Sequence, residues 1–425
     1  MTRRESIVVL GTAAFAADKP RLWRSDPPRD CPFPLSTKVG GLAFTGVHSN
    51  YGSSTEPGSG WGDTWYPSWA ADNRMYSPYT DGGCPRGDGT YDRSASYPGD
   101  RATTGCAVME GDDPVNLKVR SLGLVKASPL PYQGRYPCGS LVRNGIWYYG
   151  TYTLGPDGQV KHDGAVYNWP WLGPFVGFRT STDFARTWTE TPHTPAKPIF
   201  GENGLRGQAV KIGSPHFVDF GREMQHSPDG KAYLLAHGAI DPDPQPRYAN
   251  ASWITGDQIF LLRVEPSLKT INDPAAYEFF AGYDLHAQPV WTRDFARIRP
   301  LLDWNNHCGC VTATYVPGLK TYLMFITDGW PTAGRMSTSV FEAPQLTGPW
   351  RLVAYLKDFG QQAYFVNLPS KFIAPDGRKA WLCYSANFAP NWNGMRIEAD
   401  PPGSRYGLVM QEILLPDPRQ AKVMG

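Results

Sequence analysis

A short hydrophobic pattern that recurs five times along the chain constrains the fold more than any other feature. Each copy is an aromatic or aliphatic run that ends in small or polar residues, and helical periodicity is almost absent between the copies. A further apolar run follows, as in Val176–Arg179 and Ile259–Leu262. The pattern is typical of propeller blades, so we expect each copy to be an inner strand that is followed by wider outer strands. The copies are Met75–Gly82, Trp147–Tyr152, Tyr233–Gly238, Tyr322–Gly329 and Trp381–Asn387.

Composition supports an all-β fold made of a single β-propeller, with five repeat cycles. Aromatic residues make 13% of the chain and include 15 Trp, a load that a disordered chain does not carry. Charged residues make only 19%, which argues against long charged helices, and the net charge of +2 gives no electrostatic footprint for nucleic acid. Strand signals continue to about residue 416, so we expect residues 40–425 to form the propeller and residues 17–39 an N-terminal extension.

The segment Ser181–Trp188 resembles the Asp-box of sialidase-like propellers, with Ala185 in place of the usual Gly. Thr292–Arg297 is a partial second copy. In such a hairpin the Asp caps backbone N–H groups and the Trp packs between sheets. We therefore expect Asp183 and Trp188 to have structural roles.

The N-terminus predicts export. Arg3 and Arg4 precede a short apolar run and an Ala-x-Ala-like site that ends at Ala16, which together are typical of a twin-arginine-like signal peptide over residues 1–16. The apolar run is about half the ~20 residues needed to span a bilayer, and we expect no membrane insertion elsewhere. The predicted location is the periplasm or the outside of the cell.

Seven cysteines fit an oxidising compartment, although the number is odd. Cys31, Cys84, Cys106 and Cys138 are the disulfide candidates, and their pairing stays open. The run His307–Cys310 holds two thiols and an imidazole, but one Cys-x-Cys without a second pair is a weak zinc signal. Nothing requires a cofactor, and a structural Ca²⁺ or Zn²⁺ has no support from any motif.

One loop region concentrates the groups that sugars need, namely flat aromatic faces and short polar side chains. It offers the imidazole of His48, the amide of Asn50, the carboxylate of Asp63 and the indoles of Trp65 and Trp69. We interpret these residues as a substrate-binding cluster at the axial mouth.

A second cluster contains His216, His226 and His237, three of the eight histidines. His237 ends one of the five repeated runs, where an axial site is expected. Arg135 lies beside another and can bind a carboxylate through two parallel hydrogen bonds. The combination favours an anionic sugar as substrate.

Several motifs together resemble the secreted L-rhamnose-α-1,4-D-glucuronate lyases, propeller enzymes related in architecture to ulvan lyases. The resemblance covers nearly all of the mature chain. It implies seven blades, against the five repeats counted above, and cleavage of rhamnosyl–glucuronate linkages on plant-type polysaccharides. The motifs are His48–Tyr51, Asp63–Ala70, Tyr76–Gly82, Gly134–Ser140, His216–Gly221 and His226–Tyr233.

Under this hypothesis the reaction is a β-elimination. It requires a group that neutralises the uronate carboxylate, a base for the C5 proton and an acid for the leaving oxygen. We assign the first task to Arg135, and the other two to His48 with Tyr149 or His237 as its counterpart. Asn50, Asp63, Trp65, Trp69, His216 and His226 would hold the sugars, and we expect the enzyme to act as a monomer.

Two alternatives stay open. A five-bladed glycoside hydrolase would use a pair of carboxylates across the axial pocket. A non-catalytic glycan-binding propeller would need the aromatic residues but no acid–base pair. The carboxylate candidates for the hydrolase are Asp63, Asp81, Glu202, Asp219, Glu223 and Asp328.

Overall fold

The computed structural model describes most of the chain. The described residues are 19–52, 60–96, 101–126, 133–154, 160–162, 165–167, 171–204, 208–241, 253–329, 334–386 and 400–425. The predicted signal over residues 1–16 lies outside them.

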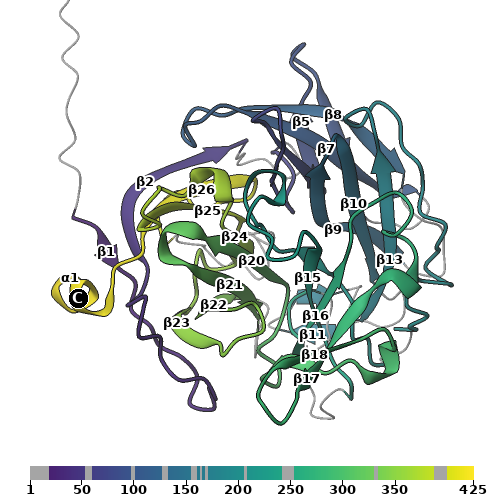
Figure 1. Ribbon diagram of the computed structural model, residues 1–425. Coiled ribbons are helices and arrows are strands. Elements are labelled where there is room, and N and C mark those ends of the chain that lie inside the picture. The colour runs from purple at the N-terminus through teal and green to yellow at the C-terminus, as the bar shows by residue number, and fades with distance from the viewer. Residues whose placement is uncertain are drawn as a thin grey trace, which may run out of the picture.

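Five antiparallel sheets form the five blades of a propeller, arranged in a ring (Figure 1). Blade 1 contains β3 (Ser68–Trp69), β4 (Met75–Tyr79), β7 (Thr103–Glu110) and β8 (Lys118–Lys126). Blade 2 contains β9 (Gln133–Arg143), β10 (Ile146–Leu154) and β13 (Leu172–Ser181). Blade 3 contains β14 (His216–Phe217), β15 (Ala232–Gly238), β16 (Gln258–Val264), β17 (Glu278–Tyr283), β18 (Pro289–Thr292) and β19 (Pro300–Asp303).

Blade 4 contains β20 (Val311–Val316), β21 (Thr321–Asp328), β22 (Ser337–Ala343) and β23 (Arg351–Leu356). Blade 5 contains β24 (Tyr364–Asn367), β25 (Lys379–Ser385), β26 (Leu408–Leu414), β2 (Ala43–Tyr51) and β1 (Arg21–Leu22). Because β2 pairs with β26, the N-terminal part of the chain completes the last blade and closes the ring.

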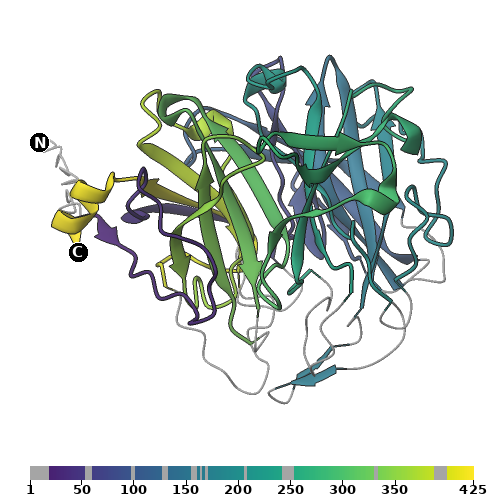
Figure 2. The same cartoon turned by 60° about the horizontal axis from the view of Figure 1, so that its bottom comes forward.

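Short hairpins, 3₁₀ turns and one helix lie outside the five sheets. Two hairpins form separate two-stranded sheets, β5 (Gly82–Pro85) with β6 (Tyr91–Ser94) and β11 (Val160–His162) with β12 (Ala165–Tyr167). The 3₁₀ turns are η3 (Arg222–Met224), η4 (Pro274–Ala276), η5 (Phe295–Arg297), η6 (Pro317–Leu319) and η7 (Ser370–Phe372). Helix α1 (Pro418–Met424) lies outside the ring beside β1, as both views show (Figures 1 and 2). Among the described residues, no helix is long and apolar enough to cross a membrane.

The five repeated runs of the sequence are one strand from each blade, so the prediction of five cycles is confirmed and the seven blades implied by the resemblance are wrong. The runs are, however, the second strands β4, β10, β15, β21 and β25 rather than the innermost ones. Strand β21 is buried along its whole length, whereas β8 at the outer edge of blade 1 shows a largely alternating burial pattern. A second strand is apolar on both faces because a neighbouring blade covers each face, which makes it the easiest strand to recognise from sequence.

Hydrogen bonds between neighbouring blades hold the innermost strands together. The Asn367 side chain donates to the Trp65 carbonyl at 2.9 Å, which joins blade 5 to blade 1. Four further bonds complete the ring: Val142 N to Ser68 Oγ (2.8 Å), Gly139 N to the Pro215 carbonyl (2.8 Å), Asp219 N to the Ala313 carbonyl (2.9 Å) and Thr312 Oγ1 to the Val366 carbonyl (2.7 Å).

The Asp-box has the predicted structural role. Asp183 accepts hydrogen bonds from Thr187 N at 2.9 Å and from the hydroxyls of Thr187 and Ser181 at 2.6 and 2.8 Å. Trp188 packs against Trp147 and Tyr149, with ring centroids 5.5 and 5.6 Å apart. In the partial copy, Asp294 Oδ1 accepts from Ala296 N at 3.0 Å and caps η5.

All seven cysteines are free thiols in the structure, so the expectation of disulfides among Cys31, Cys84, Cys106 and Cys138 is corrected. Three of these four are fully buried in blades and only Cys31 is partly exposed. Cys84, Cys106 and Cys138 are packed as small apolar side chains, a common role of cysteine in a core.

Candidate active site

The carboxyl group of Asp63 lies where side chains of three blades meet. Asp63 precedes β3 and pairs with Thr80 through two backbone hydrogen bonds, which fixes it beside the innermost strand of blade 1. From the neighbouring blade 5, the Tyr364 hydroxyl at the start of β24 donates to Asp63 Oδ2 at 2.7 Å. The phenol of Tyr152, near the end of β10 in blade 2, lies within electrostatic range of the same carboxyl. Asp63 therefore lies at one end of the propeller axis.

Burial, together with the negative charge of Asp81, raises the pKa of Asp63 to about 8. Hydrogen bonds from Tyr364, Thr64 and Tyr406 act in the opposite direction but do not compensate, and the Thr64 hydroxyl donates to Asp63 Oδ1 at 2.8 Å. A carboxyl in this environment keeps its proton near neutral pH, as a general acid must.

Asp81 is the second carboxyl group of the site. It follows β4, and Ser96 donates to it from its backbone N–H at 2.7 Å and from its hydroxyl at 2.6 Å. Burial raises the pKa of Asp81, while the two bonds from Ser96 stabilise its charged form. Asp81 is also more exposed than Asp63. Two neighbouring carboxyls in unequal environments can divide the acid and the carboxylate role between them.

Three residues of this region have left-handed backbone conformations. Thr64 has φ 66°, Asp81 has φ 51° and Phe365, next to Tyr364, has φ 55°. The left-handed region is unfavourable for a β-branched or aromatic residue, so the surrounding contacts must hold these conformations. Left-handed residues also occur elsewhere, for example Phe184 and Ala185 in the Asp-box, so it is the environment of the carboxyl groups that marks Asp63 and Asp81 as the candidate site.

An axial cluster of Tyr66, Ser214, His216 and Cys310 lies further along the inner strands. The Tyr66 and His216 rings are 4.0 Å apart, and Cys310 Sγ and Ser214 Oγ each lie 3.2 Å from His216 Nε2. Burial lowers the pKa of His216, with the nearby His237 adding to the effect, and burial raises the pKa of Cys310 to about 12. The imidazole and the thiol are therefore both uncharged at neutral pH.

The other end of the axis holds a small cavity of about 50 Å³ between Tyr66, Gly139, His216, Asp219 and Thr312. Such a volume accepts a few water molecules. A second cavity at this end, of about 180 Å³, is lined by Trp69 and His226 among others. We place the candidate active site at the Asp63 end because the two carboxyl groups in unequal environments lie there.

The remaining carboxylate candidates are engaged in structural hydrogen bonds. Asp219 accepts from the backbone of Gly221 and Ser370 (2.9 and 2.8 Å), and Glu223 accepts from the backbone of Ala71 and Asn144. Glu202 accepts from Lys211 N and Ile212 N, and burial raises its pKa to about 7. Asp328 binds His307 Nδ1 and the Tyr355 hydroxyl, each at 2.6 Å.

The structure does not bring together the residues that we assigned to β-elimination. His48 is exposed on β2, the fourth strand of blade 5 counted from the axis. Tyr149 is buried, and its hydroxyl donates to the Gly105 carbonyl of blade 1 at 3.0 Å. His237 is buried at the end of β15 in blade 3. Arg135 is on β9 opposite Thr153, and its side chain lies outside the described part of the chain.

The predicted sugar-binding residues are also dispersed. Asn50 lies on β2 and donates to the Gly403 carbonyl at 3.3 Å. Trp65 is buried and stacked on Tyr79 at 5.3 Å. Trp69 and His226 line a second cavity at the end opposite Asp63. Asp63 and His216 lie on the axis, and Trp69 also lines the small axial cavity beside His216.

Sequence reasoning missed Tyr364, Tyr406, Tyr66 and Cys310. The Tyr406 hydroxyl donates to the Asp81 carbonyl at 2.7 Å, across 325 residues of sequence. Cys310 belongs to the run that we examined for zinc, but no group of three or more His, Cys, Asp or Glu could hold a metal ion among the described residues. No local signal marks these residues, because ring closure alone brings them together.

The comparisons with known proteins give only distant likenesses. No protein-family model matches the chain, and no curated protein matches it. Among solved structures, it is similar to a putative hydrolase from Bacteroides ovatus (12% identity, TM-score 0.45, covering 92% of this chain and 93% of that one). It is also similar to an α-L-arabinofuranosidase from Podospora anserina, with 9% identity and a TM-score of 0.43 over 94% of this chain and 98% of that one. A third similar structure is a family 117 glycoside hydrolase from Zobellia galactanivorans, with 13% identity and a TM-score of 0.45 over 87% of this chain and 90% of that one. Likenesses this distant do not indicate a function for this chain.

Proposed function

We propose that the protein is a glycan-degrading glycoside hydrolase whose acid–base pair is Asp63 and Asp81. The observation that carries the proposal is a carboxyl group on the propeller axis that burial and a neighbouring carboxylate keep protonated. Hydrolysis of a glycosidic bond needs one protonated carboxyl for the leaving oxygen and one carboxylate that activates water or attacks the sugar.

The two residues take different roles in this proposal. Asp63, fixed by Tyr364 and Thr64, donates its proton to the glycosidic oxygen. Asp81, stabilised by Ser96, supplies the carboxylate, and its negative charge also keeps Asp63 protonated. Trp253 stacks on the Tyr364 ring with centroids 4.8 Å apart and keeps the phenol directed at Asp63.

β-Elimination of a uronate-containing glycan is the second candidate, and one observation favours it. The axial cluster places the phenol of Tyr66 against the imidazole of His216, whose Nδ1 has no hydrogen-bond partner among the described residues. A Tyr–His pair can transfer the two protons that an elimination requires. The rhamnosyl–glucuronate linkage is the substrate that this second candidate would take.

One assay separates the two candidates. The protein is incubated with neutral arabinoxylan and with a glucuronate-containing gum, and reducing ends and the ultraviolet absorbance of unsaturated uronate are followed together. Hydrolysis releases reducing ends without new absorbance. In that case Asp63→Asn should lower turnover at least ~100-fold, the contribution of a positioned proton donor, while His216→Ala should affect it much less.

The opposite pattern would reject the hydrolase. If absorbance rises in step with the reducing ends, and if His216→Ala is the inactive variant, elimination is the reaction. If neither glycan is cleaved but both are bound, the glycan-binding alternative is supported instead.

A further inference from the structure

A groove of about 730 Å³ lies away from the axis, on the outer part of blades 1 and 2. It lies between the turn of the β5–β6 hairpin, strand β8 and the Asp-box turn. Its lining includes Arg86, Asp92, Arg120, Tyr76, Phe184 and Arg186. We call it the blade 1–2 groove. Its volume is within the range of small-ligand sites, and none of the residues proposed for catalysis lines it.

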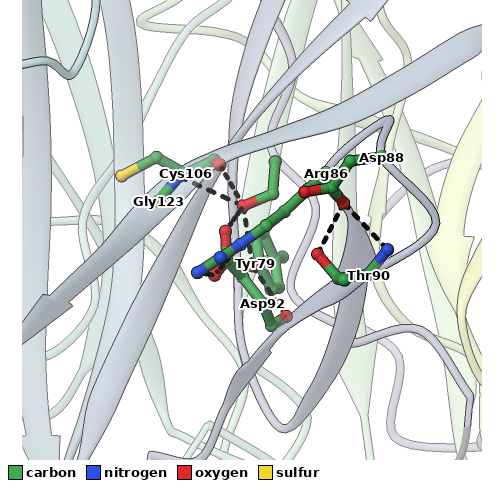
Figure 3. A network of polar contacts seen from close by, with 8 residues as sticks. Tyr79, Arg86, Asp88, Thr90, Asp92, Cys106 and Gly123 are labelled. Carbon is green, nitrogen blue, oxygen red and sulfur yellow. Dashed lines mark hydrogen bonds and ion pairs between the residues drawn. The ribbon is translucent and has the colours of Figure 1, made fainter.

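Arg86 lines this groove and is held by the buried carboxylate of Asp92 (Figure 3). Its Nε donates to Asp92 Oδ1 at 2.7 Å, and Asp92 also accepts from Ser121 Oγ at 2.7 Å. The Asp92 side chain is only 4% exposed, whereas that of Arg86 is 54% exposed. One edge of the guanidinium is therefore fixed by the protein, and the rest can bind a ligand.

Two further arginines of the groove, Arg120 and Arg186, are exposed and have no ion pair among the described residues. Arg120 lies on β8, close to the turn that carries Gly87, where a Cβ would be 3.3 Å from Arg120 Cδ. Gly87 has φ 94°, so the turn both requires glycine and leaves room for the arginine. Unpaired guanidinium groups in a concave surface attract anions and bind carboxylates with two parallel hydrogen bonds.

An aromatic pair forms one wall. Phe184 stacks on Tyr76 with ring centroids 5.0 Å apart and an interplanar angle of 27°. The Tyr76 ring is buried and anchored through its hydroxyl to Asp72 at 2.7 Å, whereas Phe184 is 36% exposed. The exposed ring of Phe184 is a rigid apolar face beside Arg186, suitable for the C–H surface of a sugar.

We propose that the blade 1–2 groove is a binding site for an acidic oligosaccharide, separate from the catalytic site. Its lining also includes the carboxylates Asp72, Asp92 and Asp183. A nucleic acid would bring its phosphates against those carboxylates with few hydroxyl donors beside them. Each residue of an acidic oligosaccharide instead carries hydroxyls beside its carboxylate, and these can donate to Asp72 and Asp183. A groove that combines arginines with acceptor carboxylates therefore fits a uronate-containing glycan better than a phosphate polymer.

The proposal is tested by calorimetric titration of the full chain with a hexamer of galacturonate and with maltohexaose, its neutral counterpart. The variant is Arg120→Gln/Arg186→Gln. The matched control is Arg293→Gln/Arg297→Gln, which removes the same charge from the exposed surface of blade 3. Arg297 occupies the position in the partial Asp-box that Arg186 occupies in the complete one. We expect the groove variant to weaken galacturonate binding at least ~10-fold, because it removes charge-assisted hydrogen bonds, and the control to leave it unchanged.

Further measurements test whether the ligand binds in the groove and which class of anion it prefers. Hydrogen exchange of the Asp-box turn should slow when galacturonate is bound, since the ligand covers Phe184. A sulfated hexasaccharide that binds more tightly than galacturonate would overturn the assignment of the groove to uronates. Equal loss in the control variant, binding unchanged in the groove variant, or tighter binding of a hexadeoxynucleotide than of galacturonate would each overturn the proposal. Because only binding is measured, the result does not depend on whether Asp63 is the catalytic acid.

Discussion

The Tyr364 hydroxyl and the Asp63 carboxyl, 301 residues apart in sequence, form a hydrogen bond of 2.7 Å across the junction of blades 5 and 1. This is the junction at which the ring closes. The bond therefore links the assembly of the fold to the protonation state of the proposed catalytic acid. It also opposes the effect of burial, because a donor favours the charged form of a carboxyl.

The first prediction concerns that bond. Tyr364→Phe removes the donor while keeping the ring, so the pKa of Asp63 should rise further. If Asp63 is the general acid, the alkaline limb of the pH–rate profile should move to higher pH by about one unit, since a hydrogen bond to a charged group contributes about 1.5–3 kcal/mol. Rates measured between pH 5 and 9 check this. A shift of the acidic limb instead would make Asp63 the base.

The second prediction concerns stability against pH. The pKa of Asp63 is about 8 in the folded protein against an ordinary 3.8, so between these values the folded state keeps a proton that the unfolded chain has released. The stabilisation from this group is complete below about pH 4 and is lost as pH rises toward 8. In the Asp63→Asn variant this side chain is uncharged at every pH. The melting temperature of the variant should therefore fall less between pH 5 and pH 8 than that of the wild type. Parallel pH dependences in the two proteins would contradict the raised pKa.

The third prediction concerns the Asp-box. Asp183→Ala removes the acceptor for Thr187 N and for two hydroxyls, so the melting temperature should fall by a few degrees while turnover of the folded protein stays the same. Asp294→Ala in the partial copy is the matched variant and should have a smaller effect, because Asp294 accepts from one backbone N–H, that of Ala296. A loss of turnover at unchanged melting temperature would give Asp183 a role in the reaction.

The fourth prediction concerns the thiols. Unreduced protein that is denatured and then alkylated should take up seven labels, because all seven cysteines are free. In the native protein only Cys31 should react, and slowly, because it is the one partly exposed thiol and burial raises its pKa. Mass spectrometry counts the labels. Five or fewer in the denatured protein would reveal a disulfide.

The fifth prediction tests the closure of the ring. Asn367→Ala leaves the buried carbonyl of Trp65 without the donor that reaches it across the blade junction, and should destabilise the protein by about 1–3 kcal/mol. Urea denaturation at constant m-value measures this. The exposed Gln288→Ala, in the β17–β18 turn, is the control and should change stability little. An unaffected midpoint in Asn367→Ala would mean that this contact does not help to close the ring.

Much of the architecture could be predicted because its signals are local. The second strands, such as β21 (Thr321–Asp328), are apolar on both faces since a blade lies on each side, and their recurrence gave the correct number of five blades. Ser181–Trp188 likewise carries its own turn chemistry, so the role of Asp183 could be foreseen. The innermost strands are short or irregular, as Ser68–Trp69 and His216–Phe217 are. The second strands were therefore mistaken for the inner ones.

The sequence by itself determined the five-fold repetition, the all-β class and the structural turns, because each depends on residues that are close together in the chain. Only the tertiary structure decided which polar groups meet. His48 and Asp63 are only 15 residues apart in sequence, yet one is exposed on the fourth strand of blade 5 and the other is buried on the axis. Closure of the ring instead brings Tyr364 and Tyr406 to Asp63 and Asp81. The protonation of Asp63 depends on that burial and on the neighbouring charge, and neither exists before the blades come together.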